Sequence, residues 1–414
     1  MKPALKKLLP AVAAVLIAAT SKTLALQIPD NVPSWKKIPP QTLASLLRQG
    51  ELVAVDRING GKVEMISIGM LADSPPEKIW NVITDFEGYT NLLPDSLKTT
   101  LISRKGNTAV VRFAVSVLKI SIVNITTDYT LKYTLAPPKR ADISWVEGDV
   151  KNVDGFWELH PVNNGAKTVV IYAITSDLGS ANPLVGAFLA EQPETTMAVN
   201  LSSAIIFTRK IMEKATGTQR PSAPRGSQPI WKTLDEATLH KLLSGGRVGF
   251  ISRIGASEIA AAGVLVRKKR NFVWNTLTDF ERYPEKIEQI TRSEILERNE
   301  KSARVRMSTN IISLGPIKIA SDETSIYYFD KPSKMWCEDE NAAVKNDDII
   351  NRWLLTPLAG GAQTALFNEL TTDISSMGTI ANFMLKRIPS LQIAVDLSMT
   401  MILTNEIKKW AESE

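Results

Sequence analysis

The chain contains one segment twice. Residues 79–89 read IWNVITDFEGY and residues 273–283 read VWNTLTDFERY, and seven of these eleven positions are identical. The similarity extends over most of the chain, and Trp157 aligns with Trp353. The offset between the copies is 194 or 196 residues, and it changes only in segments predicted to be loops. The repeat therefore restricts the chain to two copies of one fold.

The copies are separated by a short segment of different composition. Residues 216–229 read TGTQRPSAPRGSQP and are rich in Thr, Pro, Ser and Gly, which is typical of a linker. We expect a first domain over 35–215, a linker over 216–230 and a second domain over 231–414, each domain with its own N-terminal preface. A length of 414 residues suits this division.

The N-terminal 25 residues have the composition of a secretory signal peptide. They read MKPALKKLLPAVAAVLIAATSKTLA, with early lysines, an apolar run and small residues before Ala25. The apolar run is shorter than the roughly 20 residues needed to span a bilayer. We therefore expect cleavage after Ala25 and a secreted or periplasmic protein.

Charge and rare residues narrow the possible functions. The formal net charge of +6 falls to +2 without residues 1–25, which contain four Lys and no acid, so we expect no nucleic-acid partner. The single Cys, Cys337, excludes an internal disulfide bond. The two His residues, His160 and His240, occupy non-equivalent positions. We predict no metal site, no cofactor and no catalytic residue.

Each copy shows the same predicted order of elements. In the first copy, Ser74 as N-cap, Pro75 and Glu77 form a capping box that begins a helix, and a short second helix follows. Six or so strands come next, marked by alternating apolar residues and by turn residues between them. A long helical region over 183–214 closes the copy, and Pro193 must begin or interrupt a helix there.

The opening motif resembles that of START-like (SRPBCC) domains, in particular the polyketide cyclase and coenzyme Q-binding branch. In that pattern Trp, Asp and Tyr are followed by Pro, and this sequence places them at Trp80, Asp85, Tyr89 and Pro94 and again at Trp274, Asp279, Tyr283 and Pro284. The resemblance implies an α+β protein with two helix-grip domains, each a curved antiparallel sheet around a long C-terminal helix. It also implies an apolar cavity between sheet and helix.

The residues of the motif themselves indicate structural roles. Asp85 lies at a helix junction, where a carboxylate caps the next helix, and residues two apart on a helix do not face each other. Asp85 and Glu87 are therefore not predicted to be an acid–base pair. Arg112 and Arg306 lie on the polar face of their strand and are predicted to be solvated, with a ligand-binding role as the alternative.

The predicted ligand is a hydrophobic small molecule such as a lipid, a sterol or hopanoid, or a quinone, held in the cavity by apolar burial. A protein that binds such a ligand would contact a membrane transiently. The sequence does not define the oligomeric state. The predicted cavity lining is Tyr89, Leu92, Leu93, Val111, Phe113, Val115, Trp157 and Tyr172 in the first copy, and Tyr283, Ile287, Met307, Trp353 and Phe383 in the second.

The copies differ where the ligand would bind. Phe113 becomes Met307, and Tyr172-Ala173 becomes Asn368-Glu369. We therefore expect either two different ligands or one binding pocket supported by the other copy.

Two other functions remain open. A cyclase or aromatase would need polar groups inside the cavity, and the candidates are Tyr172, Asn368, Glu369 and Arg112. A partner-binding assembly module would use the preface helix TLASLLRQG.

Overall fold

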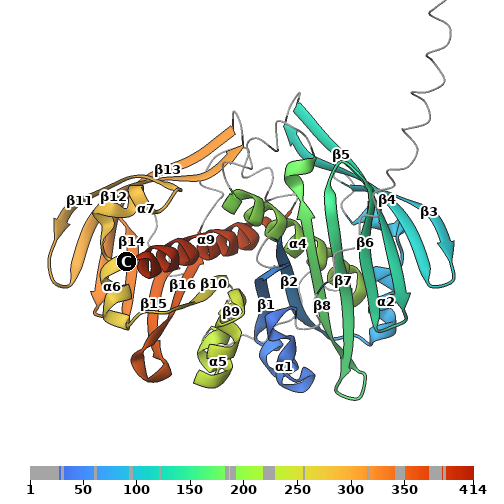
Figure 1. Ribbon diagram of the computed structural model, residues 1–414, viewed down its shortest axis with the longest axis horizontal. Helices are drawn as coiled ribbons and strands as arrows, with labels where there is room; N and C mark the ends of the chain where they lie inside the picture. The colour runs from blue at the N-terminus through green and yellow to red at the C-terminus, as the bar shows by residue number, and fades with distance from the viewer. Residues whose placement is uncertain are drawn as a thin grey trace, which may run out of the picture.

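A computed structural model describes residues 32–59, 63–92, 97–120, 123–181, 193–217, 229–254, 257–314, 317–340, 350–372 and 388–414, together with residues 28, 186 and 385 (Figure 1). The predicted signal peptide and most of the predicted linker lie outside the described residues. The description below concerns the residues in these ranges.

The described strands form one antiparallel sheet of sixteen strands, in the order β11-β12-β13-β14-β15-β16-β10-β9-β1-β2-β8-β7-β6-β5-β4-β3. The first eight in chain order are β1 (Gly50–Ile58), β2 (Val63–Ala72), β3 (Leu97–Lys105), β4 (Thr108–Ile120), β5 (Val123–Ala136), β6 (Arg140–Gly148), β7 (Lys151–Val162) and β8 (Lys167–Asp177). The second copy contributes β9 (Gly246–Ile254), β10 (Ser257–Val266), β11 (Ile290–Arg298), β12 (Ser302–Leu314), β13 (Ile317–Asp330), β14 (Lys334–Asp339), β15 (Ile350–Leu358) and β16 (Gln363–Thr371).

The single sheet differs from the expected two separate sheets. Each copy begins its sheet with an edge strand, β1 or β9, and the two edges pair antiparallel, with Leu52 opposite Phe250. An unpaired edge leaves a row of backbone N–H and C=O groups without partners. Pairing the two edges satisfies these groups and joins the copies through the middle of the sheet.

The helices follow the repeat. Each copy has a preface helix, α1 (Pro40–Leu47) or α5 (Glu236–Leu243), and a motif helix, α2 (Pro76–Ile83) or α6 (Arg270–Leu277). The second motif helix is followed by α7 (Tyr283–Lys286). The long helices are α4 (Pro193–Thr216) and α9 (Leu391–Ser413), and α4 begins at Pro193. The short 3-10 turns are η1 (Ser34–Lys37), η2 (Glu87–Asn91), η3 (Leu178–Ser180), η4 (Ile230–Thr233), η5 (Phe280–Arg282) and η6 (Ala359–Gly361).

The start of α2 differs by one residue from the predicted start. Pro75 has extended backbone angles, φ −67° and ψ 152°, so it is the N-cap residue and the helix begins at Pro76. No side chain caps this end, and the predicted capping role of Ser74 is wrong.

The sheet is covered on both faces in its central part. On one face, which we call the inner face, α4 and α9 meet at the middle of the molecule (Figure 1). On the other, outer face, α1 and α5 pack against the strands nearest the β1–β9 junction. Alternate residues of each strand point to opposite faces, so Tyr172 of β8 belongs to the inner core and Ala173 to the outer one.

Two buried ionic clusters connect the copies. In the first, Arg209 of α4 contacts Glu51 of β1 at 2.7 Å and Glu258 of β10 at 3.1 Å. Burial raises the pKa of Glu51, although Arg209 partly offsets that effect. Since removing one partner of a buried ion pair leaves an uncompensated charge, this cluster fixes α4 across both copies.

The second cluster is centred on Arg247 of β9, the repeat equivalent of Glu51. Arg247 contacts Glu194 at the start of α4 and Glu64 of β2, each at 2.6 Å. Asn405 and Lys409 of α9 also donate hydrogen bonds to Glu194, each at 3.1 Å. Glu194 therefore connects α4 both to β9 of the second copy and to α9.

Candidate functional site

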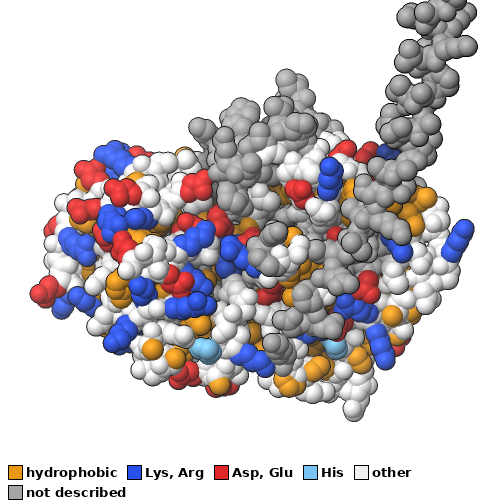
Figure 2. All heavy atoms as spheres, in the orientation of Figure 1, with side chains coloured by type: hydrophobic (Ala, Val, Ile, Leu, Met, Phe, Trp, Pro, Cys, Tyr) orange, Lys and Arg blue, Asp and Glu red, His pale blue; other side chains and the backbone are white. Residues whose placement is uncertain are grey.

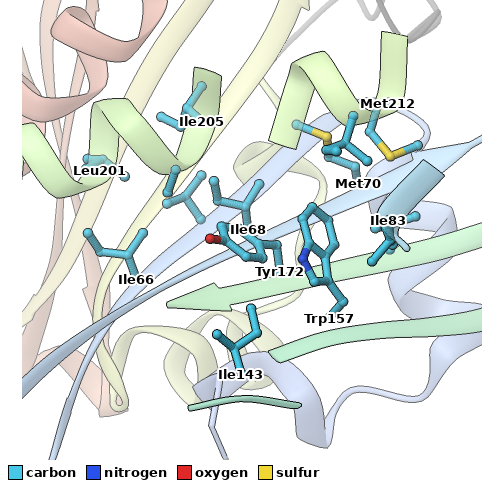
Figure 3. Packing of buried hydrophobic residues seen from close by; sticks show 14 of the residues in the cluster. Ile66, Ile68, Met70, Ile83, Ile143, Trp157, Tyr172, Leu201, Ile205 and Met212 are labelled. Atoms are coloured by element: carbon cyan, nitrogen blue, oxygen red, sulfur yellow. The ribbon is translucent and has the colours of Figure 1, made fainter. Parts of the chain in front are cut away.

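The candidate site of the first copy lies between the inner face and α4. Trp157 of β7 and Tyr172 of β8 stack with ring centroids 4.3 Å apart, and both point toward the helix (Figure 3). Phe207 of α4 closes against them at 6.2 Å and 5.9 Å. Three rings from three elements thus make the centre of an aromatic surface.

This surface continues across the strands that lie farther from the centre. Phe113 of β4 stacks on Tyr129 of β5 at 5.4 Å, with 11° between the ring planes. Val111 and Phe113 are buried and Val115 is half-buried on the same face, as the strand alternation predicts. Leu92 also packs against this core, whereas Leu93 lies outside the described residues.

Tyr89 is a structural joint. Its hydroxyl donates a hydrogen bond of 2.5 Å to the carbonyl oxygen of Ile83, the last residue of α2. In the second copy the Tyr283 hydroxyl donates to the carbonyl oxygen of Leu277 at 2.6 Å. Burial raises the pKa of both phenols, so both stay protonated donors. The repeated motif therefore fixes the turn between the first helix and the following one.

Asp85 has the predicted capping role. Its carboxylate accepts a hydrogen bond from the backbone N–H of Gly88 at 3.1 Å and pairs with Lys214 of α4 at 2.8 Å. The bond from Lys214 and that from Gly88 lower the pKa of this carboxyl. Asp85 is therefore ionised at neutral pH and holds the joint against α4.

The inner face of the first copy carries several hydroxyls. They belong to Tyr129, Tyr133 and Tyr172, and to Thr127 next along β5, whose side chain is 2% exposed and whose hydroxyl has no hydrogen-bond partner among the residues that the structure describes. Burial raises the pKa of Tyr129 to about 12 and raises those of Tyr133 and Tyr172, so all three are neutral donors.

Trp145 of β6 adds a further donor. It packs against the same core, and its buried indole N–H has no partner in the described part of the chain. An indole can only donate, and a buried donor without an acceptor costs free energy. The polar groups of the first site are thus uncharged, and they can bind an acceptor such as a carbonyl oxygen.

In the second copy, Tyr283 and Ile287 are buried, Trp353 is 6% exposed and Met307 is half-buried. All four pack into the core formed by the second copy and the C-terminal part of α9. Phe383 lies outside the described residues.

Cys337 lies in the same core and is chemically unreactive. Its pKa is raised to about 12, mainly by burial and by Glu323. The thiol is therefore protonated at neutral pH, and it does not act as a nucleophile.

Arg112 does not face the inner core, as expected. It pairs with Asp128 at 2.9 Å on the exposed face of the sheet, and Arg306 pairs with Asp322 at 2.7 Å in the same way. This arrangement removes Arg112 from the candidate polar groups of an enzyme site.

The proposal that Glu369 lines the cavity is wrong. Its side chain lies on the outer face, where it accepts a hydrogen bond from the indole of Trp231 at 3.1 Å and pairs with Arg352. The alternation along β16 places Asn368 on the inner face and Glu369 on the opposite one. Tyr172 and Asn368 are the polar candidates that remain inside.

The preface helix α1 does not present a free apolar face. Leu43, Ala44 and Leu47 are buried against the outer face of the sheet, and Trp35 lies so close to Gly69 that a Cβ there would be 2.8 Å from its ring. The hypothesis of an assembly module therefore loses the contact on which it depended.

Strand alternation could have identified more of this site. Tyr129 and Tyr133 share the inner face with Leu131, and Thr127 precedes them at the same period. Phe207 is harder to find, because only the packing of α4 brings it over Trp157.

In the described ranges, no helix is both long and apolar enough to cross a membrane. Figure 2 shows Lys, Arg, Asp and Glu side chains interspersed over the second copy, at the left.

Comparison with known families gives one match for each copy. The family model described as polyketide cyclase / dehydrase and lipid transport matches residues 73–201 and 266–394. No curated protein matches the chain at a significant level.

Several solved structures are similar to this chain at low sequence identity. A Thermus thermophilus protein is 18% identical and covers 37% of this chain and 97% of its own, with a TM-score of 0.30. The di-domain aromatase/cyclase of the steffimycin biosynthetic pathway is 13% identical. The match covers 84% of this chain and 98% of that protein, with a TM-score of 0.28. A STAR-related lipid transfer protein from Xanthomonas axonopodis is 10% identical. The match covers 40% of this chain and 94% of that protein, with a TM-score of 0.28. Similarity at this level says nothing about activity.

Proposed function

The chain belongs to the polyketide cyclase / dehydrase and lipid transport family, and we propose that it is an exported protein that binds and transfers a hydrophobic small molecule. The ligand would lie between the inner face of the first copy and α4. Lipids, sterols, hopanoids and quinones have the required chemistry, because each combines a large apolar body with a small polar group.

One observation carries this proposal: an aromatic surface with neutral phenol hydroxyls, beside two buried donors, on Thr127 and Trp145, that have no partner in the described part of the chain. The rings of Phe113, Trp157 and Phe207 offer apolar contact, which contributes roughly 25 cal/mol per Å² of ligand surface removed from water. The hydroxyls of Tyr129 and Tyr172 would donate to the polar group of the ligand. A purely structural core has no need of donors without acceptors.

Export is proposed from the composition of residues 1–25. A carrier outside the cytoplasm would move an insoluble molecule through an aqueous compartment. Mass spectrometry of the purified protein tests this directly, because cleavage after Ala25 leaves Leu26 as the first residue. A chain that stays in the cytoplasmic fraction with Met1 still attached would contradict export.

The ligand proposal is tested by purifying the exported protein without detergent and analysing an organic extract by mass spectrometry. We expect about one apolar molecule for each first-copy site. The double variant Tyr129→Phe/Tyr172→Phe keeps both rings and removes both donors, so it should retain about tenfold less ligand. Tyr327→Phe in the second copy is the matched control and should retain the ligand.

An empty extract, together with no binding to a lipid panel, would overturn the proposal. Equal ligand content in the double variant and the parent would place the ligand elsewhere. Release of a chemically altered ligand would favour a cyclase instead.

A further inference from the structure

The sheet ends in two strands that pair on one side only within the described ranges. These end strands are β3 in the first copy and β11 in the second (Figure 1). They are equivalent in the repeat, because Ile102 of β3 aligns with Leu296 of β11 at an offset of 194 residues. The two ends of the molecule can therefore be compared position by position.

Both end strands expose an apolar side chain at this equivalent position. The pairing of β3 with β4 skips Ile102, and the pairing of β11 with β12 skips Leu296. Ile102 is 54% exposed and Leu296 is 41% exposed. A β-bulge redirects the side chain that it carries. The fold thus holds a large apolar side chain in solvent at each end of the sheet.

The charges around the exposed side chain of the first copy are all positive. β3 contains Lys98, Arg104 and Lys105 and no acid, and all three side chains are exposed. None of them forms an ion pair or a side-chain hydrogen bond with another residue that the structure describes. The first end of the sheet therefore has uncompensated positive charge.

The equivalent cations of the second copy already have partners. Arg292, which aligns with Lys98, pairs with Glu294 at 2.5 Å. Arg298, which aligns with Arg104, donates a hydrogen bond to the carbonyl oxygen of Thr278 at 3.1 Å. The strand has two cations and two acids, so its charges balance. The two ends share a backbone plan and differ in charge.

Three exposed lysines of the first end share the outer face of the sheet. Each lies level with a residue of β4 that alternates with the buried Val111, and the pairs are Lys98 with Ala114, Lys105 with Thr108 and Lys132 of β5 with Val110. Six residues of β4 separate the first two pairs, which corresponds to roughly 20 Å along the strand. The positive charge is therefore spread over a broad surface.

Protection against strand pairing does not explain this end. Charged side chains on an edge strand prevent pairing with another chain, and β11 has such charges in both signs. That purpose requires no excess of cations, and an exposed apolar side chain such as Ile102 works against it. The bulge also interrupts the hydrogen-bond ladder, so β3 is a poor template for a further strand.

A lipid surface fits this combination better than a nucleic acid does. Phosphate backbones attract cations, but they offer nothing for an exposed aliphatic side chain to contact. An anionic bilayer offers negative headgroups to the lysines and an apolar interior to Ile102. Broad positive charge beside one apolar side chain is thus complementary to a bilayer.

We propose that the basic end of the first copy docks onto an anionic lipid surface. Its residues are Lys98, Ile102, Arg104, Lys105 and Lys132. This inference rests on the proposed function, since a carrier of a hydrophobic molecule must meet a membrane to load or release it. Each cation near such a surface strengthens binding by about fivefold.

The basic end adjoins the wall of the ligand site. Thr99 of β3 lies opposite Phe113 of β4, and the ring of Phe113 stacks on Tyr129. A bilayer docked at β3 would therefore lie one strand away from the aromatic surface, which shortens the path of the ligand through water.

The test is co-sedimentation of the full chain over 26–414 with two kinds of vesicle. One contains phosphatidylcholine alone, and the other contains phosphatidylcholine and phosphatidylglycerol in a three-to-one ratio. We expect binding to the anionic vesicles only, and weaker binding as salt is added. Lys98→Gln/Arg104→Gln should bind them at least about tenfold more weakly. Ile102→Ser should also weaken binding, by a smaller factor.

The second copy supplies matched controls. Arg292→Gln/Arg298→Gln changes the net charge by the same amount at the equivalent positions, and Leu296→Ser matches Ile102→Ser. Both controls should bind anionic vesicles as the parent does, and circular dichroism should show that every variant is folded. An equal loss in the two double variants would show long-range attraction by net charge, and it would overturn the docking surface. Equal binding of the parent to neutral vesicles would overturn it too.

The ligand content of the same proteins separates the two proposals. We expect Lys98→Gln/Arg104→Gln to keep its ligand while it loses vesicle binding. If the parent contains ligand but binds no vesicle, the docking surface is wrong and the proposed function stands. If the parent contains no ligand, the proposed function fails, and a loss of vesicle binding confined to the β3 variants would still support the docking surface.

Discussion

The two copies share a backbone plan but differ in the chemistry of their inner faces. In the first copy Trp157 is 1% exposed and packs between Tyr172 and Phe207. In the second copy Trp353 lies opposite the polar Asn368. Repetition has therefore conserved the joint around Tyr89 and Tyr283, while other inner-face positions have diverged. A fold can tolerate this because the joint is fixed by hydrogen bonds to the backbone, which do not depend on the lining.

The largest expected difference between the copies concerns these two tryptophans. Trp157→Ala should lower the free energy of unfolding by about 3–5 kcal/mol, because it leaves a cavity among packed rings. Trp353→Ala should cost less, because Trp353 is 6% exposed and lies opposite the polar Asn368, whereas Trp157 stacks on Tyr172. Urea denaturation followed by circular dichroism measures both. Equal losses would show that the second core is packed as tightly as the first.

Arg209→Met tests the buried ionic cluster that connects the two copies. This change leaves Glu51 and Glu258 without their common partner, and breaking a buried pair costs about 3–5 kcal/mol. Without Arg209 the pKa of Glu51 rises further, so Glu51 becomes neutral more readily as the pH falls. The loss should therefore be smaller at pH 5 than at pH 8.

The measurement is chemical denaturation of the full chain at both pH values, with Arg112→Met as the control at an exposed pair. A loss independent of pH would contradict the role assigned to Glu51. If the variant unfolds in two steps where the parent unfolds in one, the cluster is what makes the copies a single cooperative unit.

A third difference concerns the helix position held by Asn200 in α4 and by Asp396 in α9. Asp396 is 1% exposed, accepts hydrogen bonds from Thr372 and Gln392, and has a pKa raised from 3.8 to about 6, mainly by burial. The folded state thus prefers the protonated form. Its stabilising effect is fully present below pH 3.8 and is lost as the pH rises through 6.

Asp396→Asn copies the first copy's residue into the second and removes this dependence. We expect the variant and the parent to be equally stable near pH 4 and the variant to be more stable at pH 8 by about 3 kcal/mol. Thermal melts across this pH range provide the measurement. A variant less stable than the parent at pH 8 would show that the carboxylate is needed in its charged form.

The smallest expected effects are at the two matched surface pairs, Arg112–Asp128 and Arg306–Asp322. Exposed ion pairs add little to stability because water and salt screen them. Arg112→Ala and Arg306→Ala should each leave the melting temperature close to that of the parent and should not alter ligand binding. A lost ligand in Arg112→Ala would restore this residue as a candidate for recognition.

The sequence by itself determined the repeat, the order of elements and the joint. Trp80, Asp85 and Tyr89 reveal the family because their spacing is local, and the cap formed by Asp85 follows from its place between two helices. Strand alternation placed Val111 and Phe113 on the inner face for the same reason. Local spacing does not fix the first residue of α2. Pro75 has an extended backbone, so the helix begins at Pro76, one residue later than predicted.

Only the tertiary structure decided how the copies meet. The pairing of β1 with β9 and the contacts of Arg209 and Arg247 join residues far apart in the chain, and no local pattern specifies such partners. The face on which Glu369 lies depended on the register of β16, since a shift of one residue exchanges the two faces. Strand register and helix packing therefore determine which side chains of each copy lie on the inner face. Both depend on contacts across the whole sheet, which no local segment specifies.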